Sequence, residues 1–141
     1  MSSAFRVLLV EDNPGDADLT REALEEGKLM VDISVAVDGV QAIDFLLRRP
    51  PYETALLPDL ILLDLNLPKM GGREVLAEIK KHPALRVIPV VVLTSSDSES
   101  DIVKSYELGA NCYVTKPVGL QAFQTIVQHV ENFWFTVVRL P

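Results

Sequence analysis

Short apolar runs alternate along this chain with longer segments in which apolar side chains recur every three or four positions. The apolar runs are residues 7–10, 33–37, 60–63, 88–93 and 112–114. The runs at 60–63 and 90–93 contain no polar residue, which is typical of parallel strands that helices cover on both faces. The pattern therefore predicts five β-then-α units in one α/β domain, with a doubly wound, parallel, five-stranded sheet.

The segments between the apolar runs carry helix signals. Asn13 before Pro14 is typical of an N-cap followed by proline at the first helical position. Asp38 followed by Gln41 resembles a capping box. Apolar residues share one helical face in three of these segments: Val40, Ile43 and Leu47; Val75, Leu76 and Ile79; and Leu120, Phe123, Val127 and Val130.

Polar residues follow four of the predicted strands: Glu11 and Asp12 the first, Asp64 the third, Thr94 at the end of the fourth, and Lys116 the fifth. Each residue alone has an ordinary explanation as a turn former, helix cap or solvated side chain. The carboxyl ends of parallel strands meet at one edge of a sheet, however, so we expect the five residues to converge. The five residues together are therefore a much more specific sign of a functional site than any one of them alone.

Three carboxylates placed together repel one another, so positive charge must offset them. Lys116 supplies one charge, and a hard divalent cation such as Mg²⁺ would supply the rest. The group contains neither histidine nor cysteine, which argues against zinc, copper or non-haem iron. A carboxylate can attack phosphorus to form an acyl phosphate, while the metal, lysine and hydroxyl hold the phosphoryl oxygens. The predicted chemistry is phosphoryl transfer.

At these positions the chain resembles the response-regulator receiver family, over residues 5 to about 133. The motifs that carry the resemblance are VLLVEDN at 7–13, DLILLDLNLP at 59–68, GG at 71–72, VLTS at 92–95 and YVTKP at 113–117. The resemblance implies a flavodoxin-like fold with strand order 2-1-3-4-5. Residues 1–141 are expected to form a single receiver domain with an apolar C-terminal extension at about 133–141.

The resemblance also implies a role for each matching residue. Asp64 matches the phosphoacceptor, and Thr94 and Lys116 complete the catalytic set. The implied metal ligands are Glu11, Asp12, Asp64 and the backbone carbonyl of Asn66, with Mg²⁺ as the expected ion and Mn²⁺ as the alternative. Thr94 and Tyr113 match a pair of switch residues. The bond between Lys116 and Pro117 matches a peptide that is usually cis.

The segments EDNPGDADL at 11–19 and DLNLPKM at 64–70 resemble those of small regulators that are paired with phytochrome-type sensor histidine kinases. This resemblance implies such a kinase as partner and a homodimer formed through the fourth helix, fifth strand, fifth helix and C-terminal tail. The aromatic tail around Trp134 would either cover the domain's own core or add to that interface. No output domain is expected to follow, so the output would be a protein–protein interaction. The chain would not be an enzyme beyond its own phosphorylation and dephosphorylation.

Three other functions compete with this interpretation. A Mg²⁺-dependent aspartyl-phosphate phosphatase would place a second acid two residues after Asp64, where this chain has Asn66. A flavin-binding domain shares the sheet, but Glu11 and Asp12 would repel a phosphate after the first strand. A degenerate receiver that acts only as a scaffold would not need the complete acidic and basic set.

Composition restricts the possible binding partners and the cellular location of the protein. The net charge of -7 disfavours direct binding to nucleic acid. No apolar stretch approaches the roughly 18 residues of a membrane span, and the single cysteine, Cys112, excludes an intrachain disulfide. We therefore expect a cytoplasmic protein.

Overall fold

The computed structural model of the chain describes residues 5–25, 31–65, 67, 69–94 and 112–115. Its elements are β1 (Phe5–Val10), α1 (Pro14–Glu25), β2 (Val31–Ala36), α2 (Gly39–Leu46), β3 (Leu60–Leu63), α3 (Gly72–Lys81), β4 (Val90–Thr94) and β5 (Cys112–Thr115). The predicted fourth and fifth helices, the apolar extension at 133–141 and the bond between Lys116 and Pro117 lie outside the described residues. None of the helices in the described part is long and apolar enough to cross a membrane.

The five strands form one parallel sheet in the order β2-β1-β3-β4-β5, which confirms the predicted fold class. The first strand lies between the second and the third, so β2 is on one side of β1, and β3, β4 and β5 are on the other side. Val10, the last residue of β1, is in register with Ala36 and Leu63, which are the last residues of β2 and β3. The carboxyl ends of these three strands therefore lie level with one another, and the segments that follow them meet at one edge.

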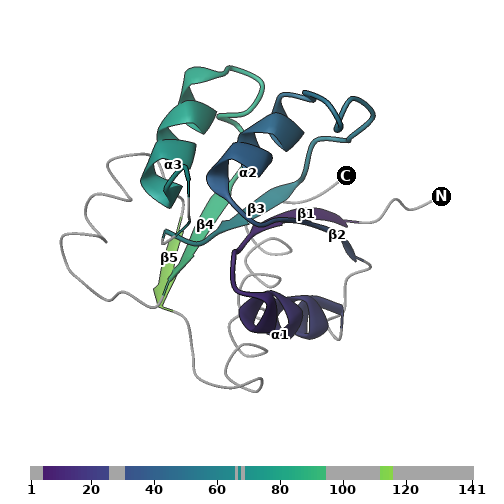
Figure 1. The fold of residues 1–141 in the computed structure, drawn as a ribbon, viewed down its shortest axis with the longest axis vertical. Helices are drawn as coiled ribbons and strands as arrows, with labels where there is room; N and C mark the ends of the chain where they lie inside the picture. The colour runs from purple at the N-terminus through teal and green to yellow at the C-terminus, as the bar shows by residue number, and fades with distance from the viewer. Residues whose placement is uncertain (1–4, 26–30, 66, 68, 95–111, 116–141) are drawn as a thin grey trace.

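Helices lie on both faces of the sheet, with α1 on one face and α2 and α3 on the other (Figure 1). Successive strand residues point to opposite faces, and the two buried clusters follow this alternation. Leu8 and Val10 belong to the cluster beneath α2 and α3, whereas Val7 and Leu9 belong to the cluster beneath α1. Both sets are at most 2% exposed. The continuous apolar runs are thus explained by burial on both faces.

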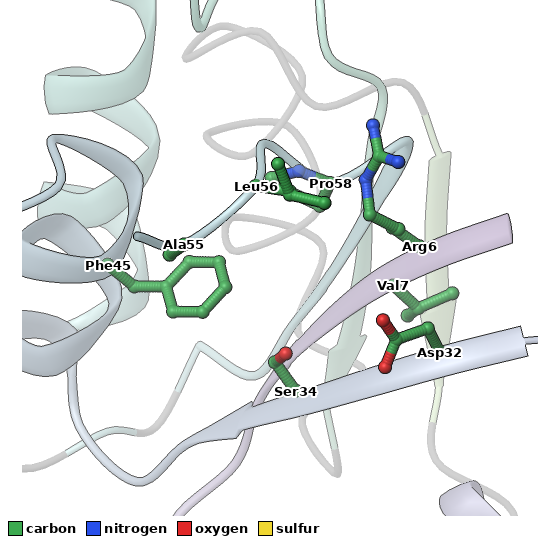
Figure 2. Close-up of a pocket in the computed structure, with 8 residues that line it drawn as sticks. All are labelled: Arg6, Val7, Asp32, Ser34, Phe45, Ala55, Leu56 and Pro58. Atoms are coloured by element: carbon green, nitrogen blue, oxygen red, sulfur yellow. The ribbon is translucent and has the colours of Figure 1, made fainter. Parts of the chain in front are cut away.

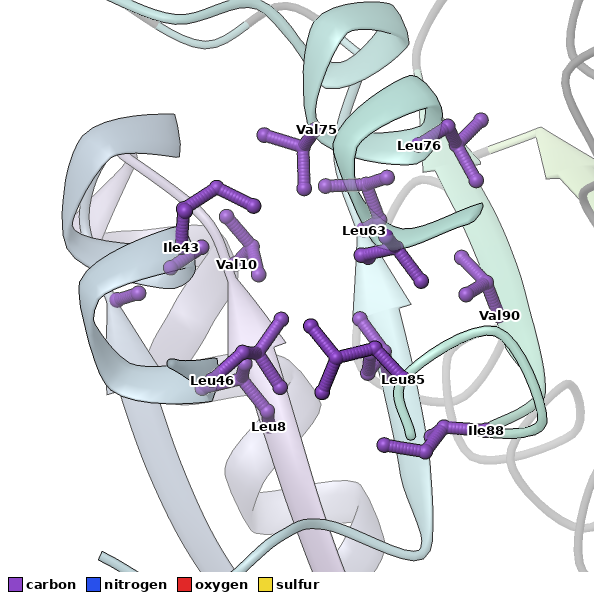
Figure 3. Packing of buried hydrophobic residues seen from close by; sticks show 14 of the residues in the cluster. Leu8, Val10, Ile43, Leu46, Leu63, Val75, Leu76, Leu85, Ile88 and Val90 are labelled. Atoms are coloured by element: carbon purple, nitrogen blue, oxygen red, sulfur yellow. The ribbon is translucent and has the colours of Figure 1, made fainter. Parts of the chain in front are cut away.

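The larger cluster joins the sheet to α2 and α3, and Figure 3 shows its side chains between the two helices and the strands. Val75, Leu76 and Ile79 are each 0% exposed, as the sequence pattern predicted for that helix. Full burial of one such side chain contributes about 1.5–3 kcal/mol. The cluster fixes α3, and with it the end of the loop that joins β3 to α3.

The predicted buried face of α2 was wrong in part. The helix buries Gly39, Ala42, Ile43 and Leu46, while Val40 is 42% exposed. Both sets have helical spacing, so the pattern alone does not choose between them. The choice follows from Gly39, because a side chain there would collide with Met70 and the glycine is held against that neighbour.

The helix starts agree with the sequence signals. Asn13 Oδ1 accepts a hydrogen bond of 3.0 Å from the amide of Asp16, and the helix begins at Pro14. Asp38 Oδ1 accepts one of 2.8 Å from the amide of Gln41. Such caps satisfy amide groups that have no partner inside the helix. They place the first turns of α1 and α2 immediately after β1 and β2.

Candidate functional site

Backbone hydrogen bonds continue past the strand ends and hold two acidic residues in place. The amide of Glu11 donates to the carbonyl of Ala36 at 2.9 Å, and the amide of Asp64 donates to the carbonyl of Val10 at 3.0 Å. These bonds tie the first residue after β1 to β2, and the first residue after β3 to β1. The backbone on which both acids stand is therefore part of the sheet framework, which suits a site that needs fixed geometry.

Three carboxylates converge at this edge, as the sequence analysis predicted. Glu11, Asp12 and Asp64 each offer a carboxylate oxygen, and these oxygens lie within 4.8 Å of one another. Glu11 is 3% exposed and Asp64 is 5% exposed, whereas Asp12 is exposed to solvent. Glu11 Oε2 also accepts a hydrogen bond of 3.3 Å from the amide of Asn13.

This donor set fits a hard divalent cation. Carboxylate oxygens are the ligands that Mg²⁺ and Mn²⁺ prefer, and the described part of the site presents neither histidine nor cysteine. Two of the three acids are buried, and a bound cation would offset the negative charge that these side chains bring together. The exposed position of Asp12 leaves one side open, where an ion would keep part of its water shell.

The remaining predicted site residues are described only in part. Thr94 ends β4 and is in register with Thr115, and Tyr113 is in register with Val92, so the backbones of Thr94 and Tyr113 belong to the adjoining strands. Their side chains lie outside the description. Asn66, Lys116 and Pro117 also lie outside the described residues, so their predicted roles stay predictions.

The loop between β3 and α3 contains contacts that the sequence analysis missed. Lys69 Nζ lies 3.5 Å from Asp38 Oδ2, which joins this loop to the start of α2. Lys69 has a φ of 64°, in the left-handed region. A lysine is an uncommon residue there, and no sequence signal marks a positive φ at a lysine. Only the capping role of Asp38 was predictable.

A pocket also lies at the other end of β1, away from the acidic cluster (Figure 2). Its lining comes from β1, β2, α2 and the connection from α2 to β3: Arg6, Val7, Asp32, Ser34, Phe45, Ala55, Leu56 and Pro58. It contains none of the three converging carboxylates. Because ligands of open parallel sheets bind at the carboxyl ends of strands, the acidic edge is the better candidate site.

Comparison with known proteins agrees with this geometry. Residues 7–128 match the family profile described as the response regulator receiver domain. The chain belongs to the response regulator receiver domain family. The matched segment contains Glu11, Asp12 and Asp64, together with all five strands except the first two residues of β1.

Relatives of this receiver domain cover almost its whole length. Response regulator Rcp1 of Synechocystis sp. is 49% identical over 135 residues, which are 96% of this chain and 92% of Rcp1. The solved structure of the Mn²⁺-bound form of Rcp1 is 48% identical, with a TM-score of 0.88 over 96% of this chain and 98% of that one. The phosphorylated cyanobacterial phytochrome response regulator RcpA is 47% identical, with a TM-score of 0.92 over 99% of both chains.

Proposed function

We propose that this receiver domain accepts a phosphoryl group on Asp64 from a sensor histidine kinase, in a Mg²⁺-dependent transfer that the domain catalyses on itself. The observation that carries the proposal is the convergence of Glu11, Asp12 and Asp64 within 4.8 Å at the carboxyl edge of the sheet. Asp64 suits the acceptor role because it is buried and stands directly after the central strand β3. Glu11 and Asp12 flank it and suit the role of metal ligands.

In the proposed transfer a carboxylate oxygen of Asp64 attacks phosphorus of a phosphohistidine. An O–P bond forms, the P–N bond breaks, and the electron pair leaves with the imidazole nitrogen, which takes up a proton. When bound, Mg²⁺ neutralises negative charge on the phosphoryl oxygens. Glu11 and Asp12 would hold the Mg²⁺ ion, and with it this positive charge, beside Asp64. The backbone carbonyl of Asn66 completes the proposed metal ligands, and Thr94 and Lys116 are proposed to hold the phosphoryl oxygens.

The proposed output is a change in protein–protein contacts. A phosphoryl group on Asp64 would draw Thr94 and Lys116 toward it, and Tyr113 would change its position in response. We assign the kinase partner to the phytochrome type, since RcpA is described as a phytochrome response regulator. Mn²⁺ is proposed as a substitute ion, since Rcp1 has a Mn²⁺-bound form. The domain is proposed to turn over no external substrate.

A homodimer through the fourth helix, β5, the fifth helix and the C-terminal tail is part of the proposal. Sedimentation equilibrium before and after phosphorylation tests it. We expect a dimer in at least one of the two states. A monomer in both states at high protein concentration would remove the dimer from the account without affecting the phosphoacceptor.

Phosphorylation by a small-molecule donor tests the proposed function. Wild type and Asp64→Asn are incubated with acetyl phosphate, with Mg²⁺ or with a chelator, and intact mass is measured. We expect one phosphoryl group on the wild type with Mg²⁺, stable in acid and lost in base. The chelated sample and Asp64→Asn should gain none, since each lacks one essential part of the site.

Two outcomes would contradict the proposal. Absence of the modification in folded wild-type protein would favour a degenerate receiver that acts as a scaffold. Steady release of phosphate from an external phosphate ester would favour the aspartyl-phosphate phosphatase instead. Circular dichroism of each sample confirms that the protein is folded, so a negative result is informative.

A further inference from the structure

The loop that follows Asp64 is held tightly at its far end by the start of α3. Gly72 is buried, and a Cβ built on it would lie 2.5 Å from the carbonyl oxygen of Asp64 and 2.6 Å from Cα of Leu65. The amide of Gly72 donates to the carbonyl of Leu65 at 3.1 Å. The first turn of α3 therefore lies against the backbone of Asp64 itself. A displacement of this turn would therefore act on the backbone of Asp64.

The other side of the same loop lies against the start of α2. A Cβ on Gly39 would lie 2.6 Å from Cβ of Met70 and would also collide with the Met70 carbonyl group. Next to this contact, Lys69 Nζ lies 3.5 Å from Asp38 Oδ2. The loop is thus enclosed between the first turns of two helices. The Lys69–Asp38 ion pair is the electrostatic contact between this loop and the start of α2.

The two partners of this ion pair are unlike in burial and in backbone conformation. The Asp38 side chain is 6% exposed, while that of Lys69 is 70% exposed. Asp38 is held in place because its Oδ1 already accepts the amide of Gln41 at 2.8 Å. Lys69, at a φ of 64°, occupies a conformation that glycine or asparagine would adopt with less strain. Strain of this kind persists where the surrounding contacts impose it.

We propose that Lys69 is a positioning residue, and that its ion pair with Asp38 fixes the loop so that Asp64 stands at the right place for the divalent cation it shares with Glu11 and Asp12. The inference rests on the proposed function, because it assigns a regulator of metal affinity to the same site. Lys69 acts through the loop backbone and through Gly72, and is not itself a metal ligand. The positively charged ammonium group of Lys69 would not bind a metal ion.

Electrostatics alone predicts a different result from the proposal, which makes a sharp test possible. Removing the positive charge of Lys69 near an acidic site would by itself raise the affinity for a cation, and removing the negative charge of Asp38 would lower it. The proposal predicts that both changes lower the affinity. It also predicts that the double variant is no weaker than the worse single variant, because the two side chains act as one unit.

The experiment measures Mn²⁺ affinity from the free-ion signal in electron paramagnetic resonance. The variants are Lys69→Met, Asp38→Asn, which keeps an N-cap residue, and their double variant. We expect each to bind Mn²⁺ roughly two- to fivefold more weakly than wild type. Lys69→Arg should restore wild-type affinity. Lys69→Gly should bind as weakly as Lys69→Met although it relieves the backbone strain.

A matched control carries the same change of charge away from the site. Lys81 at the end of α3 pairs with Glu78 at 3.0 Å, so Lys81→Met also removes one lysine from an ion pair. It should leave Mn²⁺ affinity unchanged or slightly higher. Affinity that is unchanged or raised in Lys69→Met would overturn the positioning role alone. Failure of the wild type to bind Mn²⁺ would overturn the metal site as well, so the two failures are distinguishable.

Discussion

At the scale of single residues, the two adjacent glycines at the start of α3 have different surroundings: Gly71 is the N-cap, and Gly72 is the first residue of the helix. A Cβ on Gly71 would meet nothing within 4 Å, and its φ of -69° suits any residue. A Cβ on Gly72 would collide with the backbone of Asp64 and Leu65. That backbone cannot rotate away as a long side chain could. Gly72 is therefore required by close approach, whereas Gly71 is not.

We expect Gly72→Ala to destabilise the domain by about 1–3 kcal/mol, because overpacking against backbone forces the loop to shift. Gly71→Ala should change stability by no more than about 0.5 kcal/mol, because the new methyl group meets no neighbour and the lower entropy of the unfolded chain offsets the poorer N-cap. Urea unfolding of both variants measures the difference. Equal stability of the two variants would show that the loop yields to a methyl group at Gly72.

At the scale of elements, α3 connects the core to the site. Its inner face is fully buried, and its first turn lies against Asp64. Leu76 is 0% exposed in this helix, whereas Leu56, in the connection from α2 to β3, is 60% exposed. Replacing each leucine by alanine therefore compares the loss of stability at a buried position in α3 with the loss at an exposed position outside the helix.

Leu76→Ala should reduce the free energy of unfolding by about 2–5 kcal/mol, because it leaves a cavity beneath α3. Leu56→Ala should change it by no more than about 0.5 kcal/mol. Chemical denaturation of both variants measures the effect. A small loss at Leu76 would mean that the cluster below α3 collapses readily around the missing atoms, and the role of this helix as a rigid support would have to be withdrawn.

The end of α3 contributes a pH dependence of its own. A hydrogen bond from Lys81, at 3.0 Å, lowers the pKa of Glu78 below its ordinary value of 4.5, and the positive charges of Lys81 and His82 act in the same direction. A carboxyl group with a lowered pKa in the folded state stabilises the protein above 4.5. This contribution disappears as the pH falls through the folded-state value.

Wild type should therefore be slightly more stable than Glu78→Gln at neutral pH, and the gap should close in acid. The measurement is thermal unfolding of both proteins from neutral pH to below 4.5. A gap that does not change with pH would show that the stabilisation of wild type does not come from the ionised carboxylate of Glu78.

The sequence is informative about elements wherever periodicity and caps agree. The runs at 60–63 and 90–93 predict buried strands because both faces of each strand are covered, and Asn13 predicts the start of α1 through its side chain. The buried face of α2 was not predictable, because two stripes with the same spacing compete. Contact between Gly39 and Met70, residues far apart in the chain, decides between them.

At the scale of the whole molecule, the site follows from topology. Strand order and register bring Glu11, Asp12 and Asp64 together from two strands, so their convergence was predictable once a parallel sheet was predicted. The ion pair between Lys69 and Asp38 was not predictable. It depends on a left-handed backbone at Lys69 and on the packing of a loop against another helix.

Binding of a divalent cation should stabilise the folded domain, since the unfolded chain does not bring the three carboxylates together. At an ion concentration of about 100 times the dissociation constant, we expect about 2.7 kcal/mol of added stability. Asp12→Asn should show a smaller increment. In chelator it should be at least as stable as wild type, because it removes one of three mutually repelling charges. Urea unfolding with Mg²⁺ and with chelator measures both effects.

Asp64 is proposed to carry the phosphoryl group, and locating the modified residue tests this assignment. The protein is phosphorylated with acetyl phosphate and Mg²⁺ and then treated with borohydride, which reduces an aspartyl phosphate to homoserine. Tandem mass spectrometry of the resulting peptides locates the change. We expect homoserine at position 64 alone. Homoserine at position 12, a reduced glutamyl product at position 11, or no reduced residue in a protein that has gained a phosphoryl group would contradict it.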